Sequence, residues 1–156
     1  MIEVRVTGEV NKPLKDLWKL TVKDFTEMGK WATGVLHSEK GENCDRVCKT
    51  PFGLLHEDIL LKDEKNHLIK IDAKGMPFFV TKSVGTWAFK KISSDKTGFT
   101  VELRLETMPI IGSVMGIFMK PQVKKTLEAV ASDYKIYLET GKISARKQRE
   151  IDRNKK

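Results

Sequence analysis

Six strand-like segments follow one another through the middle of the chain, and only short turns separate them. The segments lie near residues 35–40, 45–50, 54–62, 67–73, 80–92 and 98–107. Glycine, proline, asparagine and aspartate, which favour turns, recur between them. The last segment is the clearest, because apolar and polar residues alternate from Phe99 to Leu105. No turn is long enough for a crossover helix, so the six strands must form an antiparallel meander.

The N-terminal segment predicts one further strand and two short helices. Residues 2–10 alternate between apolar and polar side chains, as a half-buried strand does. Pro13 then suits the first turn of a helix, and apolar residues follow it at helical spacing. A second short helical stretch covers residues 25–31.

The C-terminal third predicts a long amphipathic helix. Apolar residues from Met115 to Tyr137 recur every three or four positions. Pro121 predicts either a kink in this helix or a break, with Pro121 as the first residue of the longer part. Gly141 fits a C-terminal cap.

This order of elements predicts an α+β fold. A seven-stranded antiparallel sheet has one apolar face to bury, and the long C-terminal helix is the only large apolar partner for it. The sheet must therefore curve around that helix. One helix cannot fill a curved sheet of this width, so we expect a cavity between them, closed at one end by the two short helices.

The chain has 156 residues and a formal net charge of +8, which is unevenly distributed. We expect one domain over residues 1–141 and a basic tail over residues 142–156, either a frayed helix or disordered. Two acidic residues in the tail, Glu150 and Asp152, oppose seven cations, so the tail carries +5 and the body +3. The cations are Lys142, Arg146, Lys147, Arg149, Arg153, Lys155 and Lys156. Such a tail could tether the protein to nucleic acid, a ribosome or an anionic membrane.

Neither a metal nor a cofactor is expected from the sequence. Cys44 and Cys48 form a single CxxxC pair, whereas structural zinc requires four ligands at motif spacings. The chain shows no signal peptide and no apolar stretch approaching the roughly 18 residues of a membrane span. We therefore expect a soluble, reduced, cytoplasmic protein.

The element order and a set of scattered residues resemble the START-like helix-grip superfamily, also called SRPBCC. The set consists of Gly41, Arg46, Gly53, Glu57 and Asp63, then Pro77, Pro109, Gly112, Met115 and Pro121. The resemblance covers residues 1–141 and includes the group of polyketide cyclases/dehydrases and lipid transport proteins. It implies a helix-grip container for a hydrophobic or amphipathic small molecule, such as a lipid or polyketide, and in some members cyclisation or dehydration.

Arg46 and Glu57 are the first candidates for polar chemistry. A two-residue loop at Pro51 and Phe52 would place Arg46 opposite Glu57 on one face of the sheet. In an apolar hollow this pair could hold a polar head group or polarise a carbonyl. The alternative is a cross-strand ion pair that fixes the register of the hairpin. His37 could serve as an acid or base near neutral pH, the alternative being a surface or structural histidine.

Methionine and aromatic residues gather in the later strands and at the start of the long helix, where a helix-grip cavity would be lined. We expect ligand contacts from Met76, Phe78, Trp87, Phe89, Met108, Met115, Phe118 and Met119. Ordinary core packing is the alternative for each of them. The leading hypothesis is thus a binding module. The second is a cyclase or dehydratase that uses Arg46, Glu57 and His37, and the third is tethering through the tail.

Overall fold

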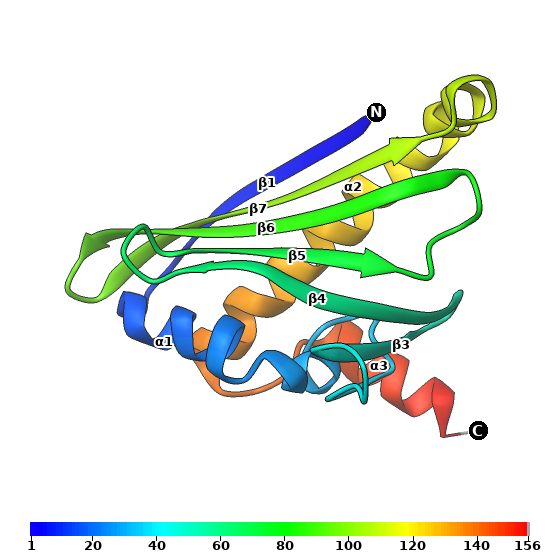
Figure 1. The fold of residues 1–156 in the computed structure, drawn as a ribbon. Helices are drawn as coiled ribbons and strands as arrows, with labels where there is room; N and C mark the ends of the chain where they lie inside the picture. Colours follow the sequence, from blue (N-terminus) through cyan, green and yellow to red (C-terminus); the bar gives the residue numbers. More distant parts are fainter. Residues whose placement is uncertain (156) are drawn as a thin grey trace.

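Seven strands form one antiparallel sheet, as the sequence predicts (Figure 1). The computed structural model describes residues 1–155. The strands are β1 (Ile2–Val10), β2 (His37–Glu39), β3 (Arg46–Thr50), β4 (Gly53–Asp63), β5 (Leu68–Lys74), β6 (Val80–Ser93) and β7 (Lys96–Thr107). They lie in the order β1-β7-β6-β5-β4-β3-β2, so β2 to β7 form the predicted meander and β1 pairs with β7.

Five helical segments complete the fold. They are α1 (Leu14–Trp18), a π-helical turn η1 (Lys19–Lys23), a 3-10 helix η2 (Phe25–Lys30), α2 (Pro109–Thr140) and α3 (Ala145–Asn154). The first three connect β1, at one edge of the sheet, with β2 at the other edge. They therefore close one end of the space beneath the sheet, where α2 also lies (Figure 1).

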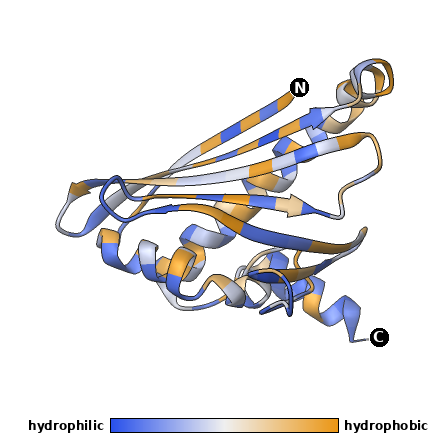
Figure 2. Ribbon diagram, viewed as in Figure 1, coloured by the Kyte–Doolittle hydropathy of each residue, from blue (hydrophilic) through white to orange (hydrophobic). Residues whose placement is uncertain are grey.

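The alternation seen in the sequence of β7 sets which face of the sheet is buried. Phe99, Val101 and Leu105 are nearly inaccessible to solvent, and polar residues separate them along the strand. The same alternation is visible as bands along the strands in Figure 2. In β1, Val4 lies opposite Leu103, so the apolar faces of the two strands coincide.

The main core forms where the C-terminal half of α2 crosses the sheet. Tyr134 of α2 is fully buried among aromatic rings, with ring centroids 4.8 Å from Trp87 and 5.2 Å from Phe99. Its hydroxyl lies 2.8 Å from the Thr21 hydroxyl and donates to the carbonyl of Leu17 over 3.1 Å. These bonds join the short helices to α2.

The long helix ends as predicted, and of the two alternatives at Pro121, a kink or a break, the break is wrong. Gly141 has φ 71° and donates its N–H to the carbonyl of Tyr137 over 2.9 Å, which is the expected cap. The helix continues through Pro121, so a separate helix does not begin there. Its first turns extend beyond the end of the sheet (Figure 1).

The prediction of a frayed or disordered basic tail is wrong for the described part of the tail, because α3 packs onto the body. Lys147 is 1% exposed, and its ammonium donates to the carbonyls of Ala32 and Val35 over 2.9 and 2.7 Å. Its third bond goes to Glu150 Oε1 over 2.9 Å. Lys156, the last residue of the predicted tail, lies outside the described residues.

Candidate functional site

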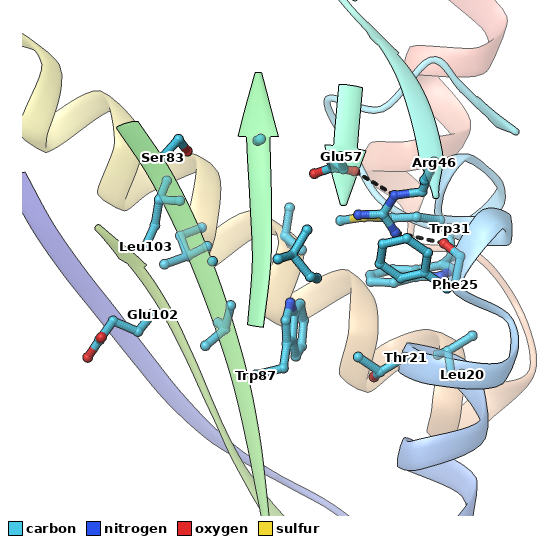
Figure 3. Close-up of a pocket in the computed structure, with 17 residues that line it drawn as sticks. Leu20, Thr21, Phe25, Trp31, Arg46, Glu57, Ser83, Trp87, Glu102 and Leu103 are labelled. Carbon is cyan, nitrogen blue, oxygen red and sulfur yellow. Dashed lines mark hydrogen bonds and ion pairs between the residues drawn. The ribbon is translucent and has the colours of Figure 1, made fainter. Parts of the chain in front are cut away.

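A cavity of about 150 Å3 lies between the sheet, the short helices and α2 (Figure 3). Its walls are mostly apolar. They are formed by Leu20, Thr21, Phe25, Met28, Trp31, Arg46, Glu57, Ile71, Ala73, Ser83, Gly85, Trp87, Val101, Glu102, Leu103, Leu127 and Val130. The predicted cavity between sheet and helix therefore exists, although it is small.

Arg46 and Glu57 form a buried ion pair at one side of this cavity. They are direct cross-strand partners in the β3–β4 hairpin, in the predicted register. Arg46 Nε donates to Glu57 Oε2 over 2.6 Å, and Nη1 donates to the carbonyl of Phe25 over 2.7 Å. The guanidinium carbon also lies 3.8 Å from the centre of the Phe25 ring, a cation–π contact. These contacts hold the guanidinium in one orientation.

The thiol of Cys48 makes a further hydrogen bond to the Glu57 carboxylate. It lies 3.2 Å from Glu57 Oε2 and donates to it. Burial raises the pKa of the Cys48 thiol to about 12, so the proton needed for this bond stays in place at neutral pH. Both contacts to Glu57 use Oε2, and no partner for Oε1 is found within residues 1–155. One carboxylate oxygen is thus available to a ligand.

The rest of the cavity offers few polar atoms. Ser83, 2% exposed, lies on the sheet across from Arg46, and Thr21 lies on η1 (Figure 3). The Glu102 carboxylate turns away from the cavity, toward Arg5, whose Nε donates to it over 2.9 Å. The site therefore combines an apolar interior with one charged end. Within residues 1–155, no three His, Cys, Asp or Glu side chains gather closely enough to hold a metal ion.

Comparison with known proteins decides the family. The model of the family "Polyketide cyclase / dehydrase and lipid transport" matches residues 1–139. The chain belongs to this family. A search of curated proteins found no significant match. The family match ends at residue 139, before α3 begins.

Solved structures with the same helix-grip fold confirm the predicted architecture. A START superfamily protein from Mycobacterium smegmatis has a TM-score of 0.69 and 17% identity, covering 88% of this chain and 97% of that chain. Norcoclaurine synthase from Thalictrum flavum, in complex with a transition-state analogue, has a TM-score of 0.68 and 14% identity over 87% and 92% of the two chains. The di-domain aromatase/cyclase BexL has a TM-score of 0.69 and 12% identity over 88% and 47%.

The structure brings together three of the residues singled out from the sequence. Arg46, Glu57 and Trp87 all line the cavity. Phe89 is buried in the main core without lining it, and Met76 and Met119 pack against a small cluster beside the cavity.

The remaining sequence candidates lie outside the cavity. Phe78, Met108, Met115 and Phe118 are 79%, 39%, 37% and 71% exposed. The sequence favours them as cavity residues because methionines and aromatic residues gather in the later strands and at the helix start. The first turns of α2, however, pass beyond the sheet. His37 is also exposed, with Nε2 3.5 Å from Glu39 Oε2, so it does not share a site with Arg46 and Glu57.

Sequence reasoning predicted that the short helices close the cavity, but it missed which of their side chains line it. Leu20, Phe25, Met28 and Trp31 form one wall of the cavity, and no motif marks them. Ser83 and Gly85 could have been predicted from the sequence as cavity residues. Alternate residues of a strand share a face, so both lie on the same face of β6 as Trp87.

Proposed function

We propose that this protein binds a small amphipathic molecule, mostly apolar with one polar group, in the cavity between the sheet and α2. The observation that carries the proposal is the Arg46–Glu57 pair at one side of an otherwise apolar cavity. Ligand sites typically combine an apolar wall with a few fixed polar groups in this way. The family description, which names lipid transport, supports the same class of ligand.

The size of the cavity restricts what can enter it. A cavity of about 150 Å3 holds a molecule the size of benzene. Drug-sized ligands occupy pockets of roughly 300–1,000 Å3. We therefore propose a ligand whose buried part is a single ring or a short alkyl segment, rather than a whole lipid.

The polar atoms define the other part of the ligand. Glu57 Oε1 can accept a hydrogen bond from a hydroxyl or amine, and Arg46 adds positive charge beside it. A ligand hydroxyl group suits both residues, because it can donate a hydrogen bond to the Glu57 carboxylate and accept one from the Arg46 guanidinium. The proposed ligand is thus a hydroxylated ring or short alcohol.

Filling the cavity tests this proposal. A Cβ added at Gly85 would meet nothing closer than the Glu102 carbonyl oxygen at 4.0 Å, so Gly85→Val can fold while occupying the cavity. Native mass spectrometry of protein purified from its own host should show a small apolar molecule on the wild type and none on Gly85→Val.

A matched glycine lies outside the cavity on the neighbouring strand. A Cβ at Gly98 would lie 3.5 Å from Ile92 Cδ1, an ordinary contact, so Gly98→Val tests the effect of a β-branched residue alone. It should retain the ligand. An empty wild-type protein, or equal retention by Gly85→Val, would contradict the proposal.

A second candidate is an enzyme of the cyclase or dehydratase type acting in the same cavity. The buried carboxylate with a free oxygen favours it, since such a group can take or give a proton. In that case Glu57→Gln would lower the turnover rate far more than the affinity, whereas in a binding protein it would lower only the affinity.

A further inference from the structure

A large apolar surface lies at the end of the molecule where α2 begins. We call it the α2 tip. It consists of eight exposed side chains: Phe78, Met108, Ile110, Ile111, Val114, Met115, Ile117 and Phe118. Four of them, Phe78, Ile110, Ile117 and Phe118, are more than two-thirds exposed, at 79%, 83%, 73% and 71%. Contiguous apolar surface of this kind marks an interaction site on a folded protein.

The helical members of the α2 tip lie on one broad face. At 100° per residue, the positions from Ile110 to Phe118 that are apolar and exposed span an arc of about 160°. The β5–β6 loop brings Phe78 to the same end, because the Met108 N–H donates to the neighbouring carbonyl of Phe79 over 2.8 Å. Figure 2 shows apolar segments on these first turns of α2, which project past the sheet.

All of the charge on the two segments that form this end is positive. Residues 74–82 contain Lys74 and Lys82, residues 107–127 contain three lysines, and neither segment contains an acidic residue. All five lysines are exposed. The three on α2 are Lys120, Lys124 and Lys125. The acidic residues that adjoin residues 107–127 are Glu106, which lies opposite Lys82 in the sheet, and Glu128, which follows Leu127.

We propose that the α2 tip docks onto the surface of an anionic lipid bilayer. Apolar side chains on a helix end, followed by lysines, fit the interface between acyl chains and negatively charged headgroups. The long lysine side chains can reach the headgroups while the rings are immersed. No helix among the described residues is long and apolar enough to cross a membrane.

Charge favours a bilayer over a second copy of the chain as the occupant. A symmetric dimer through the α2 tip would bring the five lysines of each copy against those of the other, because such an interface uses the same patch on both subunits. Like charges at close range oppose that arrangement. An anionic surface neutralises them instead. This inference does not depend on which ligand the cavity holds.

Vesicle sedimentation of the full chain tests the proposal. At low salt the protein should sediment with vesicles of equimolar phosphatidylcholine and phosphatidylglycerol, and much less with phosphatidylcholine alone. Raising the salt concentration should weaken the binding, because salt screens the lysines.

Two pairs of variants identify the surface. Ile110→Ser with Phe118→Ser should weaken binding by about tenfold or more, since two large apolar side chains no longer leave water. Ile92→Ser, at an exposed residue beside the β6–β7 turn and at the opposite end of β7 from Met108, is the control and should bind as the wild type does. Lys124→Gln with Lys125→Gln should cost about fivefold for each lysine, and Lys90→Gln with Lys91→Gln should cost less.

Three results would overturn the proposal. The first is a wild type that does not sediment with the anionic vesicles at low salt. The second is equal binding by the Ile110/Phe118 variant, provided that its circular dichroism and unfolding midpoint match those of the wild type. The third is a dimer in light scattering that the same variant converts to a monomer, which would show that the α2 tip binds a second copy.

Discussion

Arg46 and Glu57 occupy positions where charge is costly, and their neighbours compensate for that cost. Removing both charged groups from water costs several kcal/mol each unless further hydrogen bonds satisfy them. The Phe25 carbonyl, the Phe25 ring and the Cys48 thiol supply these contacts. The pair is therefore held in place by contacts beyond the cross-strand pairing of the hairpin.

The first prediction concerns Arg46→Met. We expect the free energy of unfolding to fall by about 3–5 kcal/mol, because Glu57 is left buried without its partner. We also expect loss of the ligand seen by native mass spectrometry. Denaturant unfolding measures the first effect.

A double variant separates binding from stability. Arg46→Met with Glu57→Met replaces the pair by apolar side chains of similar length, which is often neutral for stability. It should regain most of the lost stability and still fail to bind. If the double variant binds as the wild type does, the pair only fixes the hairpin.

The second prediction concerns Cys48 and alkaline pH. Its folded pKa of about 12 lies above the ordinary value of 9.0, so its contribution to stability is complete below pH 9. At higher pH the unfolded chain loses a proton that the folded protein keeps. The free energy of unfolding should then fall by up to about 1.4 kcal/mol per pH unit until about pH 12.

Comparison with Cys48→Ala isolates this effect from the titration of the lysines. Its unfolding free energy, measured from pH 8 to 11, should decline less steeply than that of the wild type. Parallel curves would show that the thiol titrates normally in the folded protein.

At the scale of elements, α3 fastens the loop that carries Trp31. Lys147 and Glu150 both bind this loop. Lys147 donates to the carbonyls of Ala32 and Val35, and Glu150 Oε2 accepts from the Gly34 N–H over 2.8 Å. Asp133 of α2 accepts from the Thr33 N–H over 2.8 Å and from the Ser144 hydroxyl over 2.6 Å. The loop behind one wall of the cavity is thus joined to both C-terminal helices.

The third prediction concerns Lys147→Met. It leaves two loop carbonyls and Glu150 Oε1 without the ammonium, so we expect a loss of about 3–5 kcal/mol in unfolding free energy. Arg149→Met, on the exposed face of the same helix, should stay within about 0.5 kcal/mol of the wild type. Equal effects of the two would mean that α3 is not fastened through Lys147.

The elements differ in how far sequence could predict them. The alternation in β7 and the two-residue turn at Pro51 depend on neighbouring residues, so the sheet and the Arg46–Glu57 register follow from local pattern. The packing of α3 depends on carbonyls at Ala32 and Val35, more than 100 residues away in the chain. A lysine gives no local sign of such partners. Likewise, apolar residues recur at helical spacing along α2. This spacing does not reveal that the first turns of the helix have no sheet to pack against.

For the whole molecule, the proposed cavity and the α2 tip use different residues, so their functions should be separable. The fourth prediction is that Ile110→Ser with Phe118→Ser retains the cavity ligand, while Gly85→Val still sediments with anionic vesicles. Native mass spectrometry and vesicle sedimentation of both variants provide the comparison. If each variant lost both activities, the two regions would be one site.

The pairing of β1 with β7 also governs how the chain can fold during synthesis. Ile2 is made early, but its strand partner is Leu105. At about 5–20 residues per second, the ribosome needs roughly 5–20 s to reach that partner. Over that time the first strand has an open edge on each side, which is a template for pairing with other nascent chains. The consecutive strands β2 to β7 can pair in turn as they emerge, whereas β1 can join the sheet only after β7 has been made.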